Sequence, residues 1–182
     1  KRYNGKNYRP TGLLHDFGES DTMYFGLLTG SYTNNLQGGV LRKALSSFQD
    51  EVNSTTGQFV SATNGIVKTL NTLKIDDPKS TGAYNNCDTG NTLANGKCRN
   101  WGNPLAEMMF ETLRYLSGAS APTSSYSYSG SNDVNLALPK VSNWTNPYAD
   151  DGLGKRCSRP FMTVISDVNP NYDSSLPGNA FG

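Results

Sequence analysis

An aspartate near the end of the sequence stands where a short apolar segment stops. The segment, residues 161–165, holds four apolar side chains and is followed by Ser166 and Asp167. Because Pro160 precedes it and a cluster of Pro and Asn residues follows it, the pattern predicts a strand buried on both faces. In open α/β sheets, ligands and metal ions are held at the carboxyl ends of strands, so Asp167 is a candidate ligand at such an edge. The alternative is that Asp167 only caps the following turn.

A second group of ionisable side chains occupies a polar stretch and comprises His15, Asp16, Glu19 and Asp21. If this stretch approached Asp167, it could supply general acid and base groups, which must lie within hydrogen-bond reach of each other. The sequence contains no nucleophile elbow, no HExxH motif and no glycine-rich phosphate loop. We therefore expect His15 to be a surface or turn residue and the protein not to be an enzyme.

The three cysteines, Cys87, Cys98 and Cys157, lie in polar, loop-like surroundings. The first two bracket DTGNTLANGK, whose Asp, Gly and Asn residues can fold back and bring two Cβ atoms into bridging range. A disulfide between Cys87 and Cys98 is the preferred interpretation, and closing so small a loop stabilises by about 3 kcal/mol. The alternatives are free thiols in a reducing compartment and, third, a zinc site, whose usual ligand spacing is missing. If the protein is exported, we expect Cys157 to pair with a cysteine outside this sequence.

Length and composition predict one globular domain that contacts neither nucleic acid nor the interior of a bilayer. The chain has 182 residues, 35% of them hydrophobic, which suffices for one domain with its own core. Its 16 basic and 15 acidic residues leave a net charge of +1 with no basic concentration, so nucleic acid is not an expected partner. No apolar stretch approaches the roughly 18 residues of a membrane span. The sequence opens without Met in polar residues, so we expect a mature or excised fragment whose secretion depends on a leader outside it.

The first half of the chain contains the signals of a β-hairpin. Residues 23–28 are aromatic and aliphatic without a helical period, which predicts a strand. Gly38 and Gly39 then favour a turn into a second, edge strand that begins at Val40. For the continuation, a short helix over residues 42–52 is the alternative, because its apolar residues also fit a 3.6 period.

Two further segments have helical periodicity. In the first, Ile66, Val67, Leu70 and Leu73 follow Asn64, an acceptable N-cap, and Pro78 prevents extension. The second and clearest is residues 103–116, with Asn103 as the cap, Pro104 in the first turn and Gly118 as the stop. Its apolar side, which we expect to face the core, consists of Leu105, Met108, Met109, Thr112, Leu113 and Leu116.

Residues 119–156 form a polar segment that predicts a long insertion loop. Its aromatic residues, Tyr126, Tyr128, Trp144 and Tyr148, could anchor a partner, but packing of the loop onto its own domain is the favoured interpretation. Asp150, Asp151 and Gly152 resemble part of a calcium loop without the spaced acidic set that such loops need.

The order of these elements predicts an α/β fold and follows that of a von Willebrand factor A-type domain, a doubly wound, Rossmann-like sheet, without its opening strand. Four strings also resemble the PilC/PilY family of type IV pilus tip-associated adhesins and assembly factors over most of the chain. They are PTGLLHDFGESDTMYFGLLTGSYTNNLQGGVLRKALSSF, DEVNSTTGQF, CRNWGNPLAEMMFETLRYL and CSRPFMTVISDVNPNYDSSLPG. The resemblance implies that residues 1–182 are one incomplete A-type domain with long irregular insertions.

The resemblance also carries functional expectations. Family members are secreted bacterial proteins of the pilus tip or cell surface that join an A-type domain to a β-propeller. They promote pilus assembly, oppose retraction, and contribute to adhesion, twitching motility and surface sensing. The expected partners are minor pilins, the pilus tip, a host or abiotic surface, and the remainder of the same polypeptide. The alternatives are a docking module for minor pilins that needs no metal and, less favoured, a metal-dependent hydrolase.

A-type domains hold a divalent cation between three loops, and the resemblance places two of them in this chain. Asp167 stands where the third-loop aspartate belongs, and Asn103 stands where the second loop usually has Thr. An amide carbonyl is a hard oxygen donor that suits Mg²⁺ or Ca²⁺. The DxSxS motif of the first loop does not occur in the sequence. We therefore expect a partial cation site, completed upstream; the alternative is that Asn103 serves only as a helix N-cap.

Overall fold

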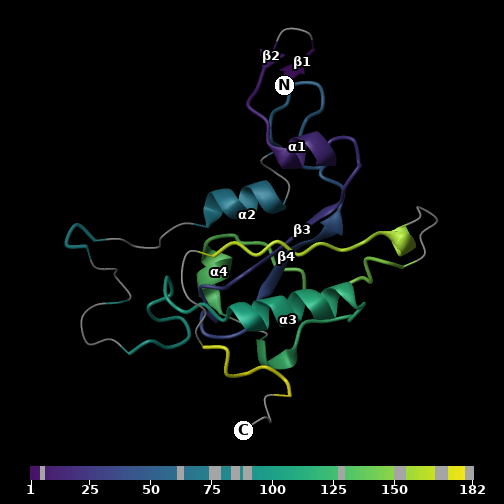
Figure 1. Cartoon of the computed structure of the whole chain (residues 1–182). Helices are drawn as coiled ribbons and strands as arrows, with labels where there is room; N and C mark the ends of the chain where they lie inside the picture. The colour runs from purple at the N-terminus through teal and green to yellow at the C-terminus, as the bar shows by residue number, and fades with distance from the viewer. Residues whose placement is uncertain are drawn as a thin grey trace.

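The chain is organised around an antiparallel β-hairpin (Figure 1). The computed structural model describes residues 1–4, 7–60, 64–73, 79–82, 87, 92–126, 130–149, 155–166 and 172–178. β3 (Phe25–Thr29) pairs with β4 (Val40–Ser46), and Thr29 lies opposite Val40 while Phe25 lies opposite Ser46. The predicted hairpin is thus confirmed. The alternative helix over residues 42–52 is wrong, because β3 supplies backbone partners to β4 as far as Ser46.

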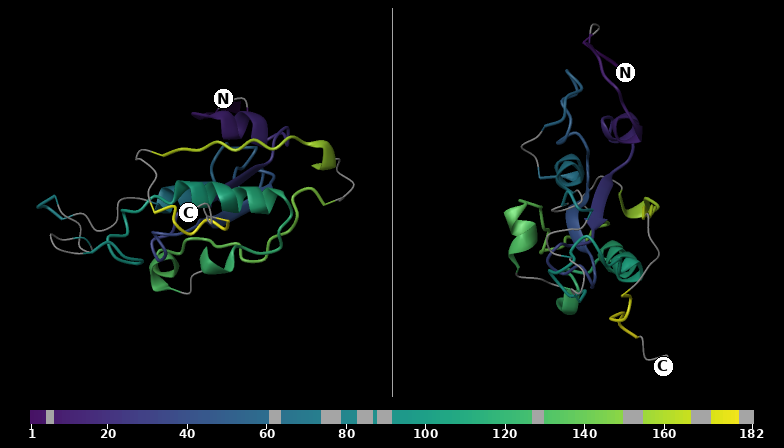
Figure 2. Two further views of the ribbon diagram at one scale, coloured as in Figure 1. Left: turned by 60° about the horizontal axis from the view of Figure 1, so that its bottom comes forward. Right: turned by 90° about the vertical axis from the view of Figure 1, so that its left-hand side faces the viewer.

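Two helices flank the hairpin, as the periodicity predicted. α2 (Ile66–Thr72) begins after Gly65 as its N-cap, one residue later than expected, and contacts β4. α3 (Leu105–Leu116) contacts both strands of the hairpin. It ends at Leu116, and Gly118 just beyond it has a φ of +89°, the left-handed conformation that favours glycine after a helix. Figure 2 shows α3 on the opposite side of the hairpin from the short helix α4 (Ser131–Asn135).

The N-cap of α3 and its buried face both differ from the sequence-based expectation. Pro104, not Asn103, is the N-cap residue. The buried side chains of α3 are Glu107, Glu111 and Tyr115, whereas Met109 and Leu113 of the predicted core face are 37% and 56% exposed. The reason is that both carboxylates are hydrogen-bonded to backbone N–H groups of other segments, which holds this polar face inward.

The hydrophobic core lies between β4, the end of α3 and the polar segment. Leu41, Tyr115 and Trp144 form its centre, with the rings of Tyr115 and Trp144 5.6 Å apart and nearly perpendicular. Val141 N–H donates to Leu41 O at 2.8 Å, which holds this segment against β4. Tyr126 is also buried. Of the four aromatic residues of the segment, Tyr126 and Trp144 therefore pack it onto its own domain, as expected. Its short helices are η1 (Ser124–Tyr126), α4 and η2 (Lys155–Cys157).

The first residues form a small unit beside the hairpin, with β1 (Arg2–Tyr3), β2 (Asn7–Tyr8) and α1 (Leu13–Gly18) (Figure 1). The expectation that His15 is a surface residue is wrong, since its side chain is 6% exposed. The imidazole lies 6.0 Å from the ring of Phe48 and 5.0 Å from that of Phe59, centroid to centroid. It is therefore a packing residue of this unit.

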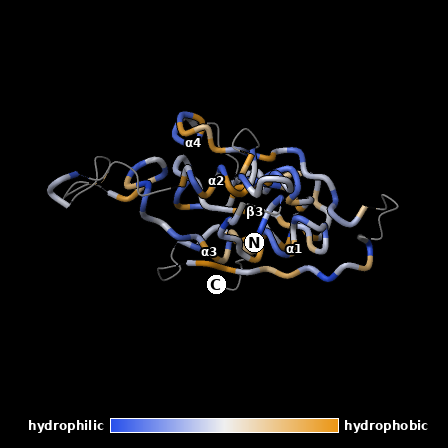
Figure 3. The backbone as a smooth tube through the Cα atoms, turned by 90° about the horizontal axis from the view of Figure 1, so that it is seen from above, coloured by the Kyte–Doolittle hydropathy of each residue, from blue (hydrophilic) through white to orange (hydrophobic). Residues whose placement is uncertain are grey.

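Residues 161–165 do not form the predicted buried strand. No strand is assigned to them, and Phe161 and Ile165 are 80% and 91% exposed. The physical reason is that no strand in the described part of the chain pairs with this segment. Figure 3, in which apolar residues are orange, shows an apolar stretch next to α3 at the outer edge of the molecule.

The fold is therefore mixed α/β with small two-stranded antiparallel sheets. Over the residues that the structure describes, no helix has the length and apolar character needed to cross a bilayer.

Candidate functional site

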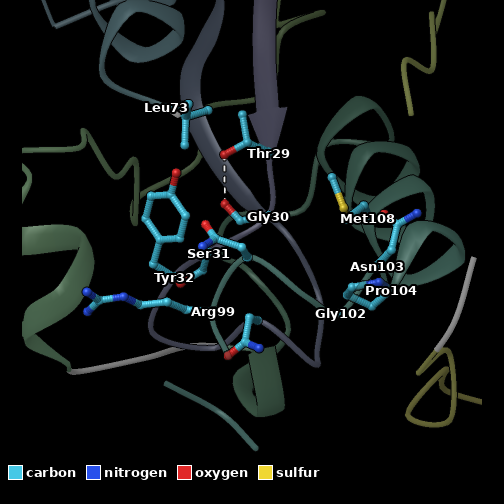
Figure 4. Close-up of a pocket in the computed structure, with 12 residues that line it drawn as sticks. Thr29, Gly30, Ser31, Tyr32, Leu73, Arg99, Gly102, Asn103, Pro104 and Met108 are labelled. Atoms are coloured by element: carbon cyan, nitrogen blue, oxygen red, sulfur yellow. Dashed lines mark hydrogen bonds between the residues drawn. The ribbon is translucent and has the colours of Figure 1, made fainter. Parts of the chain in front are cut away.

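A pocket of about 300 Å³ opens where β3 ends and α3 begins (Figure 4). Loop residues after β3 form one wall, and the segment leading into α3 forms the other. Its lining residues are Thr29, Gly30, Ser31, Tyr32, Asn35, Leu73, Arg99, Asn100, Gly102, Asn103, Pro104 and Met108. The pocket thus lies between the end of β3 and the beginning of α3.

A buried ion pair fixes the wall that follows β3. One carboxylate oxygen of Asp133 accepts hydrogen bonds from Ser31 Oγ at 3.1 Å, Tyr32 N–H at 2.8 Å and Thr33 N–H at 3.1 Å. The other accepts a hydrogen bond from Arg42 at 2.6 Å, and both side chains are at most 1% exposed. This carboxylate is therefore committed to the loop and to Arg42. Asp133 acts as a positioning residue of the pocket wall.

The opposite wall is tied to the same loop through Asn35. Its amide donates to Trp101 O at 2.8 Å and accepts from Gly96 N–H at 2.8 Å. Gly102 follows with a φ of +97°, and a Cβ at this position would lie 2.4 Å from Asn35 O. Only glycine permits this close approach of the two walls.

A disulfide joins Cys87 to Cys98 at the start of the segment that leads into the pocket, with the Cα atoms 4.3 Å apart. Cys98 is 2% exposed, and Trp101 N–H donates to Cys98 O at 2.7 Å. The bond that the sequence favoured is thus present, and it helps to hold the second wall. Cys157 is a free, exposed cysteine in this chain.

Asn103, the first predicted cation ligand, lines the pocket. Its Nδ2 donates to Ser166 Oγ at 2.9 Å, so the end of the apolar segment lies beside the beginning of α3. Asn103 does not cap the helix with its side chain, since α3 has no side-chain cap. Asp167, the second predicted ligand, lies outside the described residues, as do Tyr128, Asp150, Asp151 and Gly152. That Asp167 and Asn103 hold a cation together stays a prediction.

The pocket lining mixes apolar surface with hydroxyl and amide groups and carries one cationic side chain, Arg99. Hydroxyl and amide groups come from Thr29, Ser31, Asn35, Asn100 and Asn103. Such oxygens are of the kind that Mg²⁺ and Ca²⁺ accept, but those ions also need carboxylates. Across the described ranges, no three His, Cys, Asp or Glu side chains are grouped so that they could hold a metal ion. The oxygen atoms of the lining residues are suitable ligands for a hard cation. A bound cation would also need the negative charge of carboxylates that do not line the pocket.

The predicted acid/base group is not brought to the pocket. Glu19 receives hydrogen bonds from Lys1 and Tyr3, and Asp21 accepts one from Ser47 Oγ at 2.5 Å. Burial acts to raise the pKa of Glu19, but the hydrogen bonds from Lys1 and Tyr3 outweigh it and lower that pKa. These carboxylates stabilise the first residues of the chain and do not line the pocket.

A second acidic cluster fastens the last described segment to α3. Glu107 accepts hydrogen bonds from Gly38 N–H at 2.6 Å and Ser175 N–H at 2.7 Å. Tyr126 donates its hydroxyl to Ser175 O at 2.9 Å. Burial, followed by the nearby charges of Glu107, Glu111 and Asp173, raises the pKa of Tyr126 to about 12. The hydroxyl therefore stays protonated at neutral pH and acts as a donor.

Sequence reasoning missed Asp133, Arg42 and Glu107. A signal was available for Arg42, because it stands between the apolar pairs of VLRKAL, where a central strand residue is buried. Asp133 and Glu107 carry no such signal, because their burial depends on N–H groups from distant segments.

Comparison with known proteins identifies the family. Residues 25–182 match the family model described as the second domain of PilY1 homologs. The chain is 44% identical over 191 aligned residues to a type IV pilus biogenesis factor PilY1 homolog of Xylella fastidiosa (strain Temecula1). That alignment covers 97% of this chain but only 13% of the relative's length. No solved structure matches the chain. The chain belongs to the family of PilY1 homologs, and residues 25–182 correspond to the second domain of that family.

Proposed function

We propose that this chain is one domain of an extracellular protein that acts in type IV pilus assembly, in control of pilus retraction and in surface adhesion. The observation that carries the proposal is the 44% identity, over 97% of the chain, to a protein named as a type IV pilus biogenesis factor. The disulfide between Cys87 and Cys98 supports export, because such bonds persist in oxidising compartments such as the periplasm and cell surface. Minor pilins and the pilus tip are the proposed partners.

We further propose that the domain is von Willebrand factor A-like and that its sheet is incomplete in this chain. Two features support this assignment. β3 ends at the pocket, and the apolar segment ends at Ser166, which is hydrogen-bonded to the pocket residue Asn103. The two extended segments therefore end at the edge where α3 begins, as the strands and helices of a doubly wound sheet do.

The proposed adhesive site lies at this edge and involves a divalent cation. Asn103 and Asp167 would hold the ion, together with oxygen donors from a part of the polypeptide outside these 182 residues. When bound, the ion would supply a positive charge at the rim of the pocket. Asn103 would offer its carbonyl oxygen while its Nδ2 remains hydrogen-bonded to Ser166.

A metal-independent docking module for minor pilins is the second candidate. It is favoured by the fact that no grouping of three metal-binding side chains occurs over the residues that the structure describes. Both candidates are non-catalytic. The pocket lining, which has amides, hydroxyls and a guanidinium but no carboxylate, supports a binding role over acid/base chemistry.

The proposal is tested with the full-length polypeptide in a bacterium that lacks its own copy of this factor. We expect the polypeptide to restore surface pili, counted by electron microscopy, and twitching motility. Unchanged piliation and motility after loss and return of the protein would refute the pilus role.

Purified full-length protein then distinguishes the two candidates. Binding to minor pilins in the presence of Mg²⁺ is compared with binding after a chelator is added. The cation site is supported if binding is lost after the chelator is added and is also lost in Asp167→Asn. The control is Asp16→Asn, at an exposed carboxylate, which should keep binding. Binding that survives both treatments supports metal-independent docking.

A further inference from the structure

The short helix α1 exposes most of its large apolar side chains. Leu13 and Phe17 are 72% and 41% exposed, whereas His15 is 6% exposed and Gly18 is buried. A surface helix of a globular protein ordinarily turns its apolar stripe toward the core. In α1 these two apolar side chains face outward instead, which indicates that they contact a partner.

The exposed side chains lie together and form a surface that we call the α1 patch, consisting of Leu13, Phe17 and Met23. Leu13 and Phe17 are four residues apart, so they lie on the same face of the helix. Met23 is 39% exposed and lies beside the helix, because its N–H donates to Phe17 O at 3.0 Å. Large apolar side chains that are exposed together indicate an interaction surface, whereas single ones do not.

The inner side of α1 holds the helix in place. The ring of His15 lies 6.0 Å from that of the fully buried Phe48, centroid to centroid. A Cβ at Gly18 would lie 2.5 Å from the Cβ of Phe48, so the helix backbone packs directly against this side chain. The α1 patch is therefore already formed and does not need to form upon binding.

The α1 patch lies outside the second domain of the family. The family model matches residues 25–182, whereas all three residues of the patch precede residue 25. The alignment with the Xylella fastidiosa relative covers 97% of this chain, so most of residues 1–24 are shared with that protein. Because the matched region is a second domain, a first domain precedes it in the family. The patch therefore lies on the side of residue 25 from which the first domain is attached.

This position favours the first domain as the occupant of the patch. In space, α1 lies between the N-terminal residues and the hairpin (Figure 1). A domain on the same polypeptide reaches the patch at a higher effective concentration than a free protein does. We propose that the first domain of the same polypeptide docks onto the α1 patch and covers Leu13 and Phe17. This inference depends on neither the pilus role nor the incomplete sheet.

Photo-crosslinking of the full-length polypeptide identifies the occupant. With p-benzoylphenylalanine in place of Phe17, mass spectrometry should find an intramolecular crosslink to a residue of the first domain. The matched control carries p-benzoylphenylalanine in place of Val134, which is 69% exposed on α4, and should give no crosslink to that domain. A crosslink from position 17 to a second copy, to another protein or to any other part of the polypeptide would overturn the proposal. The absence of any crosslink from position 17 would overturn it too.

Hydrogen–deuterium exchange provides a second measurement on the full-length polypeptide. Leu13→Lys should speed exchange in α1 and in the contacted segment of the first domain by about 10-fold or more, because burying an unpaired charge is costly. Val134→Lys should leave exchange in both segments unchanged. The proposal is wrong if Leu13→Lys leaves the first domain as protected as before, or if Val134→Lys has the same effect. If Leu13→Lys prevents folding, the crosslink from position 17 still decides.

Discussion

Buried carboxylates in this chain hold loops in place. Asp133, Glu107 and Glu111 are each at most 1% exposed, and each accepts a hydrogen bond from a backbone N–H of another segment. Without these carboxylates, several N–H groups would be buried with no partner, which costs free energy comparable to a lost hydrogen bond. The polar residues of the interior therefore define the loops around the pocket.

The ion pair of Asp133 and Arg42 gives the first prediction. Asp133→Ala should lower the free energy of unfolding by about 3–5 kcal/mol, because it leaves a buried guanidinium and the N–H groups of the loop unpaired. Denaturant unfolding followed by circular dichroism measures the change. The control is Asp50→Ala, which removes a 52% exposed carboxylate paired with Lys43 and should cost less than about 1 kcal/mol. Similar costs for both variants would show that the buried pair does not hold the loop.

Tyr126 gives a prediction about alkaline pH. Its pKa is raised from 10.0 to about 12, so the protonated hydroxyl favours the folded state. The stability from this group is complete below pH 10 and is lost as the pH rises toward about 12. Tyr126→Phe also removes the hydrogen bond to Ser175 O, which should cost about 1 kcal/mol at neutral pH.

Unfolding experiments from neutral pH to about pH 12 check this dependence. Tyr126→Phe should make the alkaline loss of stability shallower, and tyrosinate absorbance should lose one group that titrates late. Tyr3, whose pKa burial and the hydrogen bond to Glu19 also raise to about 12, should still titrate late in the variant. An unchanged alkaline profile would contradict the assignment.

At the scale of single residues, the sequence predicted what local composition determines. The Cys87 to Cys98 loop is rich in turn residues, and its closure could be inferred without a fold. His15 could not be placed correctly, because its burial depends on Phe48 and Phe59, which are distant in sequence.

At the scale of elements, α3 shows how tertiary contacts override periodicity. Its apolar residues have a clear helical period, and that period predicted the helix correctly. The same pattern indicated the wrong buried face, because Glu107 and Glu111 have hydrogen-bond partners in this chain, whereas the described residues leave Leu113 56% exposed. An apolar helix face predicts burial against another segment, and the sequence of one domain need not contain that segment.

The close approach of the two pocket walls gives a prediction for Gly102. Gly102→Ala should destabilise the protein by about 1–3 kcal/mol more than Gly178→Ala, because its Cβ would lie 2.4 Å from Asn35 O. Gly178 also has a positive φ, +86°, but no atom lies within 4 Å of a Cβ there. The difference between the two variants therefore isolates the steric contact, and melting temperatures measure it. Equal destabilisation would mean that the walls can separate without cost.

At the scale of the whole molecule, the burial of apolar side chains is incomplete. The chain covers 13% of its relative's length. Leu41, Tyr115 and Trp144 are buried, whereas Phe161 and Ile165 of the apolar segment are exposed, as is Leu113 of α3. The hairpin and helices could be predicted because their partners are local. The strand at residues 161–165 could not form, because a strand needs a neighbour and none is present among the described residues.

The cation site is the whole-molecule prediction, because it needs ligands from beyond this chain. In the full-length polypeptide, Asn103→Ala should weaken Mg²⁺ binding by about 10-fold or more, through loss of a ligand oxygen and of the contact with Ser166. Asp167→Asn should weaken it further, since hard cations depend on carboxylate charge. Asn103→Thr keeps an oxygen donor and should retain most of the affinity. Asn143→Ala, at an exposed amide, should have no effect.

Calorimetric titration of each variant with Mg²⁺ measures these affinities, and circular dichroism shows whether each variant is folded. Affinity and folding must be compared across the variants. If Asn103 has only a structural role, Asn103→Ala should be less stable, but its folded fraction should bind Mg²⁺ with unchanged affinity. A ligand role lowers affinity in a folded protein and is rescued by Thr. If both Asn103→Ala and Asp167→Asn bind Mg²⁺ as the unaltered protein does, the rim of the pocket holds no cation. Metal-independent docking would then be the mode left for the proposed binding to pilins, because the pocket offers amide and hydroxyl groups that can hydrogen-bond a protein partner directly.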